Sequence, residues 1–335
     1  MPSKTNSNRD IENKIIGLLS SNLMSVTQIS QEIGVRKDVG SAILKSMKKR
    51  GKLELHKVGR SKIYTIPGIM SDSPAGVEKE KKDKKLRTIG IVSGKGGTGK
   101  TTVTLNLAGA LMNFDEDVMA VDADIKMAGL GLRLGMYNFS NTLNDVIRNN
   151  GNILEALHIH SSGIRVIPAS LTVENLELTN LYPLMEKFLT GKSLILIDSP
   201  PGLEDNFVQV LHTLKEIIVV TTPETQSITN AIKAIDKGKE LGVNCLGVVV
   251  NRYSGRENHR KVVDEIESIC DQPLLGVIPE DKTIQDSLFK KTPNVFLNPY
   301  SPSSLAFKEI AAKISGKSYE PPKFPFLRRI WGKIS

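Results

Sequence analysis

The sequence predicts an α/β protein whose main domain is a doubly wound, mostly parallel sheet. Short, almost wholly apolar runs recur after residue 87 of the 335-residue chain, and such runs are typical of strands buried on both faces of a sheet. The stretches between them are long enough for the crossover helices that parallel strands require. The expected strands are Thr88–Ser93, Val118–Asp122, Ile164–Pro168, Leu194–Asp198, Ile217–Thr221, Gly247–Asn251 and Leu274–Ile278.

The composition is that of a globular protein, with 39% hydrophobic and 24% charged residues. No apolar run is long enough to span a bilayer, and the first ten residues are polar. The two cysteines, Cys245 and Cys270, share no metal-binding or redox spacing. We therefore expect a protein of the reducing cytoplasm that is neither exported nor integral to the membrane.

Residues 1–70 predict a small module of three helices and a hairpin. Apolar spacing indicates helices near 11–19, 25–34 and 36–50, and two strand-like segments flank a turn at Gly59. This order resembles a winged helix-turn-helix domain, which implies that the third helix approaches the major groove of DNA and the hairpin reaches phosphates. The alternative is a protein-docking module whose lysines form a solvated face. The candidate DNA-binding residues are Lys37, Ser41, Lys45, Lys48, Lys49, Lys57, Arg60 and Lys62.

The segment 71–87 is highly charged and predicts a solvated linker before a main domain at 88–318. The formal net charge of +9 comes from the ends of the chain. Residues 1–70 carry 13 Lys and Arg against 5 Asp and Glu, whereas residues 88–318 carry 22 against 26. A polyanionic partner, either nucleic acid or an anionic membrane, is therefore expected at the two ends.

A glycine-rich loop follows the first expected strand of the main domain. It matches GxxxxGK[ST] and precedes a helical stretch, as phosphate binding requires. The glycines let backbone N–H groups close around phosphate oxygens, and the helix N-terminus adds its positive end. We expect Lys100 to contact the β- and γ-phosphates of ATP and the Thr101 hydroxyl to coordinate Mg²⁺. The alternative is a plain glycine turn between strand and helix. The loop consists of Gly94, Lys95, Gly96, Gly97, Thr98, Gly99, Lys100, Thr101 and Thr102.

Lys95 is a second lysine inside this loop, and the pattern KGGxGKT at 95–101 resembles the MinD/ParA family of deviant Walker A ATPases. The resemblance covers residues 88 to about 314 and is closest to MinD. It implies a P-loop NTPase of MinD-like fold that hydrolyses ATP slowly as an ATP-dependent homodimer, in which Lys95 reaches the partner's nucleotide. A cation supplied in this way neutralises transition-state charge only in the dimer, which ties hydrolysis to assembly.

The resemblance also implies roles for three carboxylates. Asp124 would orient or deprotonate the attacking water, Asp122 would support the Mg²⁺ shell, and Asp198 would hold Mg²⁺ through water. Asp122 could instead be a helix cap or a turn residue. The segment Ser199–Gly202, directly after Asp198, is similar to the family's switch II. The chain departs from the family at Gly129, where the family usually has Asn, and this departure leaves the hydrolysis rate open.

Two later segments look like the adenine pocket of the family. The Asn251 amide, followed by Arg252, would lie against the base, and Pro279 and Glu280 would supply backbone contacts. The alternative for all four residues is turn chemistry at strand ends.

Residues 319–335 predict an amphipathic helix after a proline-containing spacer. At about 100° per residue, an aromatic and aliphatic face lies opposite a cationic one. This pattern is typical of a helix on anionic lipid, and a terminal amphipathic helix is the membrane-targeting device of the MinD family. The alternative is docking on the protein's own core or dimer interface. The apolar face consists of Phe326, Leu327, Ile330, Trp331 and Ile334.

These features together predict an ATPase that uses ATP and Mg²⁺, dimerises on ATP binding and thereby switches its membrane association. We expect it in the cytoplasm and reversibly on the inner face of the cell membrane, in spatial regulation of cell division or positioning. An activating protein, which the sequence does not identify, would stimulate hydrolysis. The alternatives are a ParA-type partition ATPase, which uses DNA as its matrix, and a nucleotide-sensing DNA-binding regulator.

Overall fold

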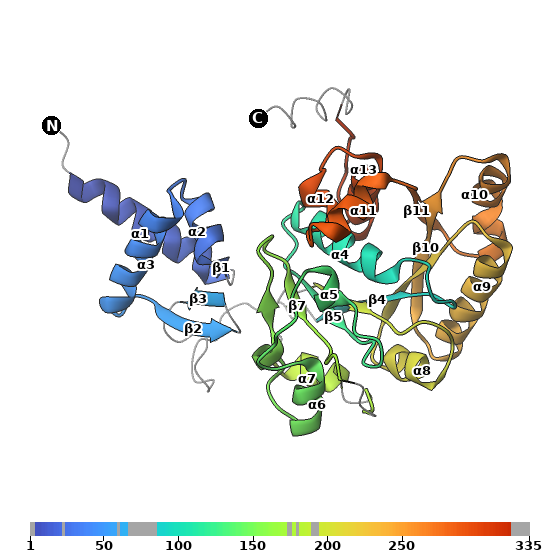
Figure 1. Cartoon of the computed structure of the whole chain (residues 1–335), viewed down its shortest axis with the longest axis horizontal. Coiled ribbons are helices and arrows are strands. Elements are labelled where there is room, and N and C mark those ends of the chain that lie inside the picture. The colour runs from blue at the N-terminus through green and yellow to red at the C-terminus, as the bar shows by residue number, and fades with distance from the viewer. Residues whose placement is uncertain are drawn as a thin grey trace. The chain divides into compact units, whose positions relative to one another are not determined.

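The computed structural model describes residues 4–21, 24–58, 61–65, 86–172, 176–178, 181–188 and 194–322. The chain divides into two compact units, Met1–Asp83 and Lys84–Ser335, which are drawn in Figure 1. No helix among the described residues is long and apolar enough to cross a membrane. The predicted turn residue Arg60 and the predicted apolar face of the tail lie outside the described residues, the latter comprising Phe326, Leu327, Ile330, Trp331 and Ile334.

The N-terminal unit contains the three helices and the hairpin that the sequence predicts, and also one short strand that it does not. In chain order these are α1 (Lys4–Ser21), β1 (Met24–Ser25), α2 (Val26–Glu32), α3 (Lys37–Lys49), β2 (Glu54–Val58) and β3 (Ser61–Thr65). The strands form an antiparallel sheet in the order β1-β3-β2. The unit has its own core, which includes Ile15, Leu44, Met47 and Tyr64. Its assignment to the winged-helix class stays a prediction.

The larger unit confirms the predicted mostly parallel sheet. Among the described residues its sheet has eight strands in the order β11-β10-β9-β4-β8-β5-β7-β6, of which only β6 is antiparallel to its neighbour. The seven expected strands are present, and β6 is an additional short edge strand. The bounds are β4 (Arg87–Val92), β5 (Val118–Asp122), β6 (His158–Ile159), β7 (Arg165–Ile167), β8 (Leu194–Asp198), β9 (Glu216–Thr221), β10 (Asn244–Tyr253) and β11 (Leu274–Pro279).

Helices cover both faces of this sheet (Figure 1). Ile218 of β9 belongs to the main apolar core together with residues of α4 and α13, such as Leu107 and Phe307. The neighbouring Ile217 points the other way, because a Cβ on Gly238 of α9 would lie 2.9 Å from its side chain. Alternation along the strand therefore produces the doubly wound arrangement. The helices are α4 (Lys100–Met112), α5 (Leu130–Arg133), α6 (Leu143–Asn149), η1 (Ile153–Ala156), α7 (Leu181–Phe188), α8 (Asp205–His212), α9 (Thr225–Glu240), α10 (Glu257–Cys270), α11 (Lys282–Phe289), α12 (Asn294–Leu297) and α13 (Pro302–Ser315).

The structure moves both predicted boundaries of the main domain outward. Arg87, assigned to the linker by its charge, begins β4, pairs with Glu216 (Nε to Oε2, 2.6 Å) and donates to the Ile314 carbonyl at 3.0 Å. At the other end, the ring of Tyr319 packs edge-on against Phe114, with centroids 5.9 Å apart. Charge composition alone could not show that Arg87 has a partner far away in the sequence.

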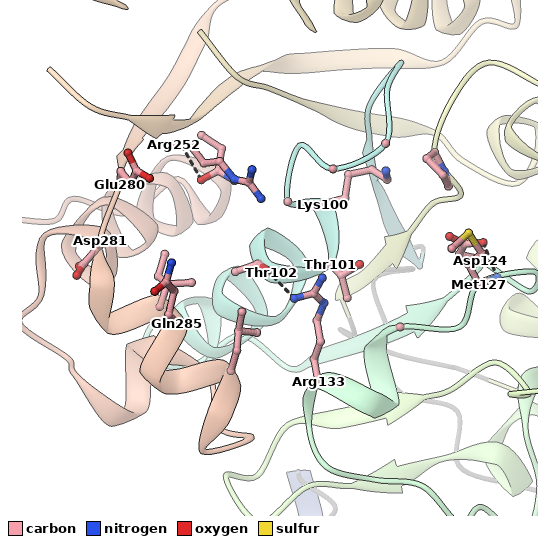
Figure 2. Close-up of a pocket in the computed structure, with 18 of the residues that line it drawn as sticks. Lys100, Thr101, Thr102, Asp124, Met127, Arg133, Arg252, Glu280, Asp281 and Gln285 are labelled. Atoms are coloured by element: carbon pink, nitrogen blue, oxygen red, sulfur yellow. Dashed lines mark hydrogen bonds between the residues drawn. The ribbon is translucent and has the colours of Figure 1, made fainter. Parts of the chain in front are cut away.

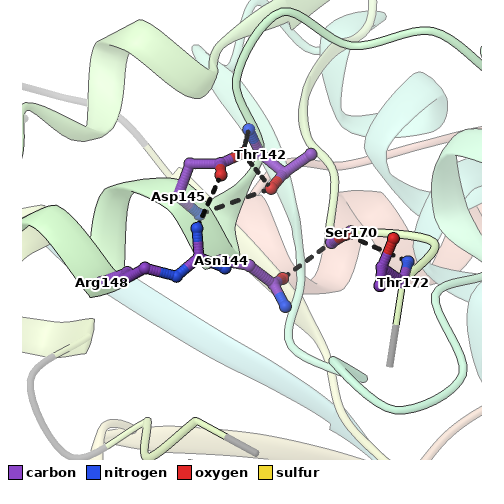
Figure 3. Close-up of polar contacts among 6 residues, drawn as sticks. All are labelled: Thr142, Asn144, Asp145, Arg148, Ser170 and Thr172. Carbon is purple, nitrogen blue, oxygen red and sulfur yellow. Dashed lines mark hydrogen bonds and ion pairs between the residues drawn. The ribbon is translucent and has the colours of Figure 1, made fainter. Parts of the chain in front are cut away.

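The helix α6 is fixed at its start by a reciprocal cap (Figure 3). The Thr142 hydroxyl accepts from the Asp145 N–H at 3.4 Å, and the Asp145 carboxylate accepts from the Thr142 N–H at 2.9 Å. Next to the cap, the buried Asn144 accepts from the Ser170 N–H at 2.9 Å, which attaches α6 to the segment after β7. Such a capping box satisfies N–H groups that a helix start leaves free.

Candidate functional site

The loop between β4 and α4 requires glycine at particular positions. Gly97 and Gly99 have φ values of +80° and +96°, a region that side-chain-bearing residues rarely adopt. Gly94 is required for a different reason, because a Cβ there would lie 2.0 Å from the backbone oxygen of Asn230. The chain can follow this path only with these glycines, and the path brings the loop close to α9.

The loop presents unpaired backbone donors. Among the described residues, none of the N–H groups from Gly97 to Thr102 donates a hydrogen bond to the protein. Three of these groups begin α4, where the helix dipole adds positive charge. A row of free N–H groups at a helix start is suited to an anion, and phosphate oxygens fit it.

Lys100 lies at the bottom of this loop. Its side chain is buried, and its Nζ donates to the Ser93 hydroxyl at 3.0 Å. Burial lowers the pKa of Lys100, while the nearby carboxylates of Asp198 and Asp124 act in the opposite direction. The Ser93 hydroxyl in turn donates to the Lys95 carbonyl at 2.7 Å, so a strand-end residue holds both the loop and its lysine.

A cavity of about 650 Å³ opens beside the loop (Figure 2). This volume is suited to a nucleotide, since ligand pockets are typically about 300–1,000 Å³. The segments that follow β4, β5, β8 and β11 and the carboxyl ends of β10 and β11 meet there, at the carboxyl edge of the parallel sheet, where ligands of open α/β sheets bind. The lining residues are Gly96, Gly97, Gly99, Lys100, Thr101, Thr102, Asp124, Met127, Gly129, Arg133, Ser199, Pro201, Asn251, Arg252, Pro279, Glu280, Asp281, Ile284, Gln285 and Leu288.

Two carboxylates, those of Asp198 and Asp124, lie near the phosphate loop. Asp198, at the end of β8, is buried and accepts from the Thr104 hydroxyl at 3.2 Å. Burial raises the pKa of Asp198 to about 6, against hydrogen bonds from Thr101 and Thr104 and the charge of Lys100. Asp124 lines the cavity, and burial likewise raises the pKa of this carboxyl. Among the described residues no group of three acidic, His or Cys side chains forms a metal cage. The Thr101 hydroxyl and the Asp198 carboxylate are oxygen ligands of the kind that Mg²⁺ prefers, and phosphate oxygens would complete its shell.

Asp122 makes the contacts that the cap alternative predicts, while its predicted support of Mg²⁺ stays a prediction. Its carboxylate accepts from three backbone N–H groups, those of Asp124 at 3.2 Å, Gly129 at 3.0 Å and Leu130 at 2.9 Å. The side chain is fully buried and is not among the cavity-lining residues. Burial raises the pKa of Asp122 well above its ordinary value, and the nearby Asp198 carboxylate adds to the shift. Asp122 thus holds the start of α5, and like Asp198 it does not line the cavity.

Lys95 does not line the cavity of its own chain. Its Nζ donates to the side-chain oxygen of Gln226, at the start of α9, at 3.2 Å. The predicted contact of Lys95 with a partner's nucleotide stays a prediction.

The four residues predicted at the adenine pocket all line the cavity. Asn251 is buried and donates from Nδ2 to the Thr98 carbonyl at 2.7 Å, while its Oδ1 accepts from the Arg252 N–H at 3.0 Å. Asn251 therefore braces the phosphate loop in this structure. Arg252 has a positive φ of 58°, and the Glu280 N–H donates to the Tyr253 carbonyl at 2.8 Å, so turn chemistry also shapes this end.

The sequence interpretation missed Arg133 and the residues of α11 that line the cavity. Arg133 donates from Nη1 to the Thr102 hydroxyl at 3.3 Å. Gln285 and Leu288 are the α11 residues that line the cavity together with Ile284. The sequence did offer one indication of a role for Arg133, because it is the single cationic residue in the apolar run at 130–134.

The candidate DNA-binding residues lie in the other unit. Lys45, Lys48 and Lys49 are exposed on α3, and Ser41 is partly buried. The backbones of Lys37, Lys57 and Lys62 lie in α3, β2 and β3, and their side chains are outside the described set.

The parallel sheet and the glycine-rich loop with its cavity together define a nucleotide-binding protein of the P-loop class. The chain belongs to the family described as the CobQ/CobB/MinD/ParA nucleotide binding domain, whose model matches residues 89–294. It is 39% identical over 235 residues to an uncharacterised ATP-binding protein of Methanocaldococcus jannaschii, which covers 69% of this chain and 89% of that protein. It is 31% identical to the septum site-determining protein MinD of Thermotoga maritima, covering 68% and 87%. The structure resembles that of the septum site-determining protein MinD complexed with Mg-ADP from Pyrococcus horikoshii, with a TM-score of 0.63 and 33% identity over 68% of this chain and 96% of that one.

Proposed function

We propose that the chain is a MinD-type ATPase that binds Mg·ATP in this cavity and hydrolyses it slowly. The observation that carries the proposal is the convergence of free loop N–H groups, Lys100 and the Asp124 carboxylate at one cavity, with the buried Asp198 carboxylate close to Lys100 and Thr101. Septum site-determining relatives support a role in spatial regulation of cell division or positioning.

The residues divide the chemistry among them. Loop N–H groups and Lys100 would bind and orient the phosphates, and Thr101 and Asp198 would hold Mg²⁺, which supplies charge neutralisation. Asp124 would orient the attacking water and take its proton. Its raised pKa makes the ionised carboxylate a stronger base than a solvated one.

The proposed cycle includes dimerisation through ATP. Lys95 is tethered only by one hydrogen bond to an exposed amide among the described residues, so its release for a partner's nucleotide costs little. We expect a specific hydrolysis rate that rises with protein concentration in the presence of Mg·ATP. Lys95→Ala should retain nucleotide binding but lose at least tenfold in rate, because it removes a transition-state cation. Gln226→Ala removes only the tether and is the matched control.

Phosphate release at several protein concentrations, with light scattering in a non-hydrolysable ATP analogue, tests this cycle. A rate per chain that does not depend on concentration, together with an active Lys95→Ala variant, would refute the dimer. An inactive Asp124→Ala variant that still binds ATP separates turnover from nucleotide sensing alone.

The proposal places the protein in the cytoplasm and, with ATP, on the inner face of the membrane through residues 323–335. Two weak helices in one dimer bind anionic lipid better than one, since the second insertion is intramolecular. Sedimentation with anionic vesicles should require ATP and should be lost in a chain that ends at Pro322. Equal sedimentation with ATP, ADP or no nucleotide would contradict the switch. Nucleoid rather than envelope localisation would favour the partition alternative.

Exposed lysines on α3 favour DNA as a second partner. Lys45, Lys48 and Lys49 make no ion pair within the part of the chain that the structure describes. A salt-titrated mobility shift of the full chain against a Lys45→Ala, Lys48→Ala, Lys49→Ala variant tests this. The intact chain should bind with a steep dependence on salt concentration, and the variant with a shallower one. Binding that is equal for both proteins removes α3 as the DNA contact.

A further inference from the structure

Arg133 is a cationic side chain at the nucleotide cavity that the proposed chemistry does not use. It is the last residue of α5, is half-buried and lines the cavity. Figure 2 shows its guanidinium beside Thr102, to whose hydroxyl Nη1 donates at 3.3 Å. The contact joins α5 to the first turn of α4.

This contact does not balance the charge of Arg133. Within the described residues, no carboxylate lies in ion-pair distance of its guanidinium. Asp281, an acidic group that also lines the cavity, is held by the N–H and hydroxyl groups of Thr283 and Ser303. A guanidinium carries five donors in a planar fork, and one neutral hydroxyl satisfies few of them. Phosphate oxygens match that fork and its charge.

The position of Arg133 along the cavity selects one phosphate. Lys100 and Asp124 mark the end where the terminal phosphates bind, and α11 with Arg252 and Glu280 marks the base end. Figure 2 shows Arg133 between these ends. Together with Ser287 and Leu288 of α11 it also lines a small adjoining hollow. In a loop of this kind the backbone cradles the α- and β-phosphates and the lysine reaches β and γ. The phosphate nearest the base is therefore the one within reach of a cation at Thr102.

We propose that Arg133 binds the α-phosphate of the nucleotide, alongside the Thr102 hydroxyl. This inference rests on the proposed nucleotide site and adds a specificity residue to it. The α-phosphate is present in AMP, ADP and ATP and does not change during hydrolysis. Arg133 therefore contributes binding that is equal before and after the reaction, which lowers KM and leaves kcat unchanged.

Calorimetric titration of the full-length protein in Mg²⁺ with AMP, ADP and a non-hydrolysable ATP analogue tests the proposal, with adenosine as the phosphate-free probe. Arg133→Met should weaken binding of all three nucleotides by the same factor, about tenfold, and leave adenosine unchanged. Arg148→Met is the matched control, because Arg148 pairs with Asp145 on α6 and does not line the cavity (Figure 3). The control should leave all affinities unchanged.

Steady-state ATP hydrolysis provides the second readout. Arg133→Met should raise KM about tenfold at constant kcat. Arg133→Gln, with a neutral amide in place of the guanidinium, should give the same pattern and replaces the methionine variant if that protein does not fold.

Three results would overturn the proposal. Unchanged affinities in a folded Arg133 variant would remove the contact. A loss confined to the ATP analogue would place the guanidinium at the γ-phosphate, and a loss that includes adenosine would place it at the ribose or base. If the unaltered protein binds no nucleotide at all, the proposed function fails and this inference fails with it. If the unaltered protein binds nucleotide and the Arg133 variants bind it equally well, only this inference fails.

Discussion

Alanine substitutions at two glycines of the phosphate loop should differ in cost, although both residues have positive φ. A Cβ on Gly97, at φ +80°, would meet nothing within 4 Å. A Cβ on Gly99, at φ +96°, would lie 2.4 Å from Nδ2 of Asn251. That nitrogen is buried and donates to the Thr98 carbonyl at 2.7 Å, so it cannot move without breaking the bond that braces the loop.

The expected loss of stability has two parts, the left-handed backbone conformation and the clash with Asn251. Both substitutions carry the cost of a left-handed conformation for alanine, about 1–2 kcal/mol. Gly99→Ala additionally displaces the Asn251 amide and leaves a buried carbonyl unpaired, which costs about 1–3 kcal/mol more. We therefore expect Gly99→Ala to destabilise the protein by about 2–5 kcal/mol and Gly97→Ala by about 1–2 kcal/mol.

A double-mutant cycle isolates the contact. In an Asn251→Ala background the clash is absent, so the extra cost of Gly99→Ala over Gly97→Ala should disappear. Urea unfolding followed by circular dichroism measures the unaltered protein, the three single variants and the two double variants. Calorimetry with ADP reports whether the loop still binds phosphate. This prediction is wrong if the two glycine variants lose equal free energy of unfolding, or if the difference between them persists in the Asn251→Ala background. Either result would show that Asn251 does not brace the loop.

Two further predictions concern features away from the cavity. Hydrogen bonds from Lys52 and Arg50 hold the pKa of Glu12 below its ordinary value. The stabilisation is therefore complete at neutral pH and is lost as pH falls through this lowered pKa. Glu12→Gln should lower the free energy of unfolding by about 1–2 kcal/mol at pH 7 and should leave it unchanged in acid below that pKa, as measured by urea unfolding at several pH values. An equal loss at pH 7 and in acid would contradict this prediction. Thr142→Ala should cost about 1 kcal/mol through loss of the α6 cap and should speed hydrogen exchange at the Asp145 amide, whereas unchanged exchange would contradict the capping role.

The sheet was predictable because strands buried on both faces leave a strong apolar signal. Each of the seven expected strands is present in the parallel part of the sheet, with ends that shift by a few residues. The edge strand β6 was not predictable, since two residues, His158 and Ile159, are too few to show a period. Arg87 was misassigned for a related reason, because its partners Glu216 and Ile314 are brought to it only by the fold.

The phosphate loop was predictable because its chemistry depends on local backbone conformation and residue order. The roles of residues whose neighbours are set by the fold were harder to predict from the sequence. The run Asp122-Ala123-Asp124 offers two carboxylates, one predicted to support Mg²⁺ and the other to act on the attacking water, but which one faces the cavity depends on where the chain turns after β5. The turn brings the Gly129 and Leu130 amides back to Asp122, and only Asp124 remains at the cavity.

The short helix α5 then connects the two chemical ends of the site. Asp122, the register partner of Asp198 in the sheet, holds the first amides of α5, and the last residue of α5 is Arg133. At Gly129 the backbone is not in the left-handed region, and a Cβ there would meet Thr101 Oγ1 at an ordinary 3.8 Å. The backbone therefore does not require glycine, and the Asn that is usual in the family would fit at least to its Cβ. This chain thus lacks a polar side chain at the Thr101 end of α5 and has a cation at the other end. In the proposed site, a group beside Thr101 would act where bonds change, whereas Arg133 would act on a phosphate that the reaction leaves intact. By the inference for Arg133, α5 therefore contributes to binding of the nucleotide and not to the step that breaks its phosphate bond.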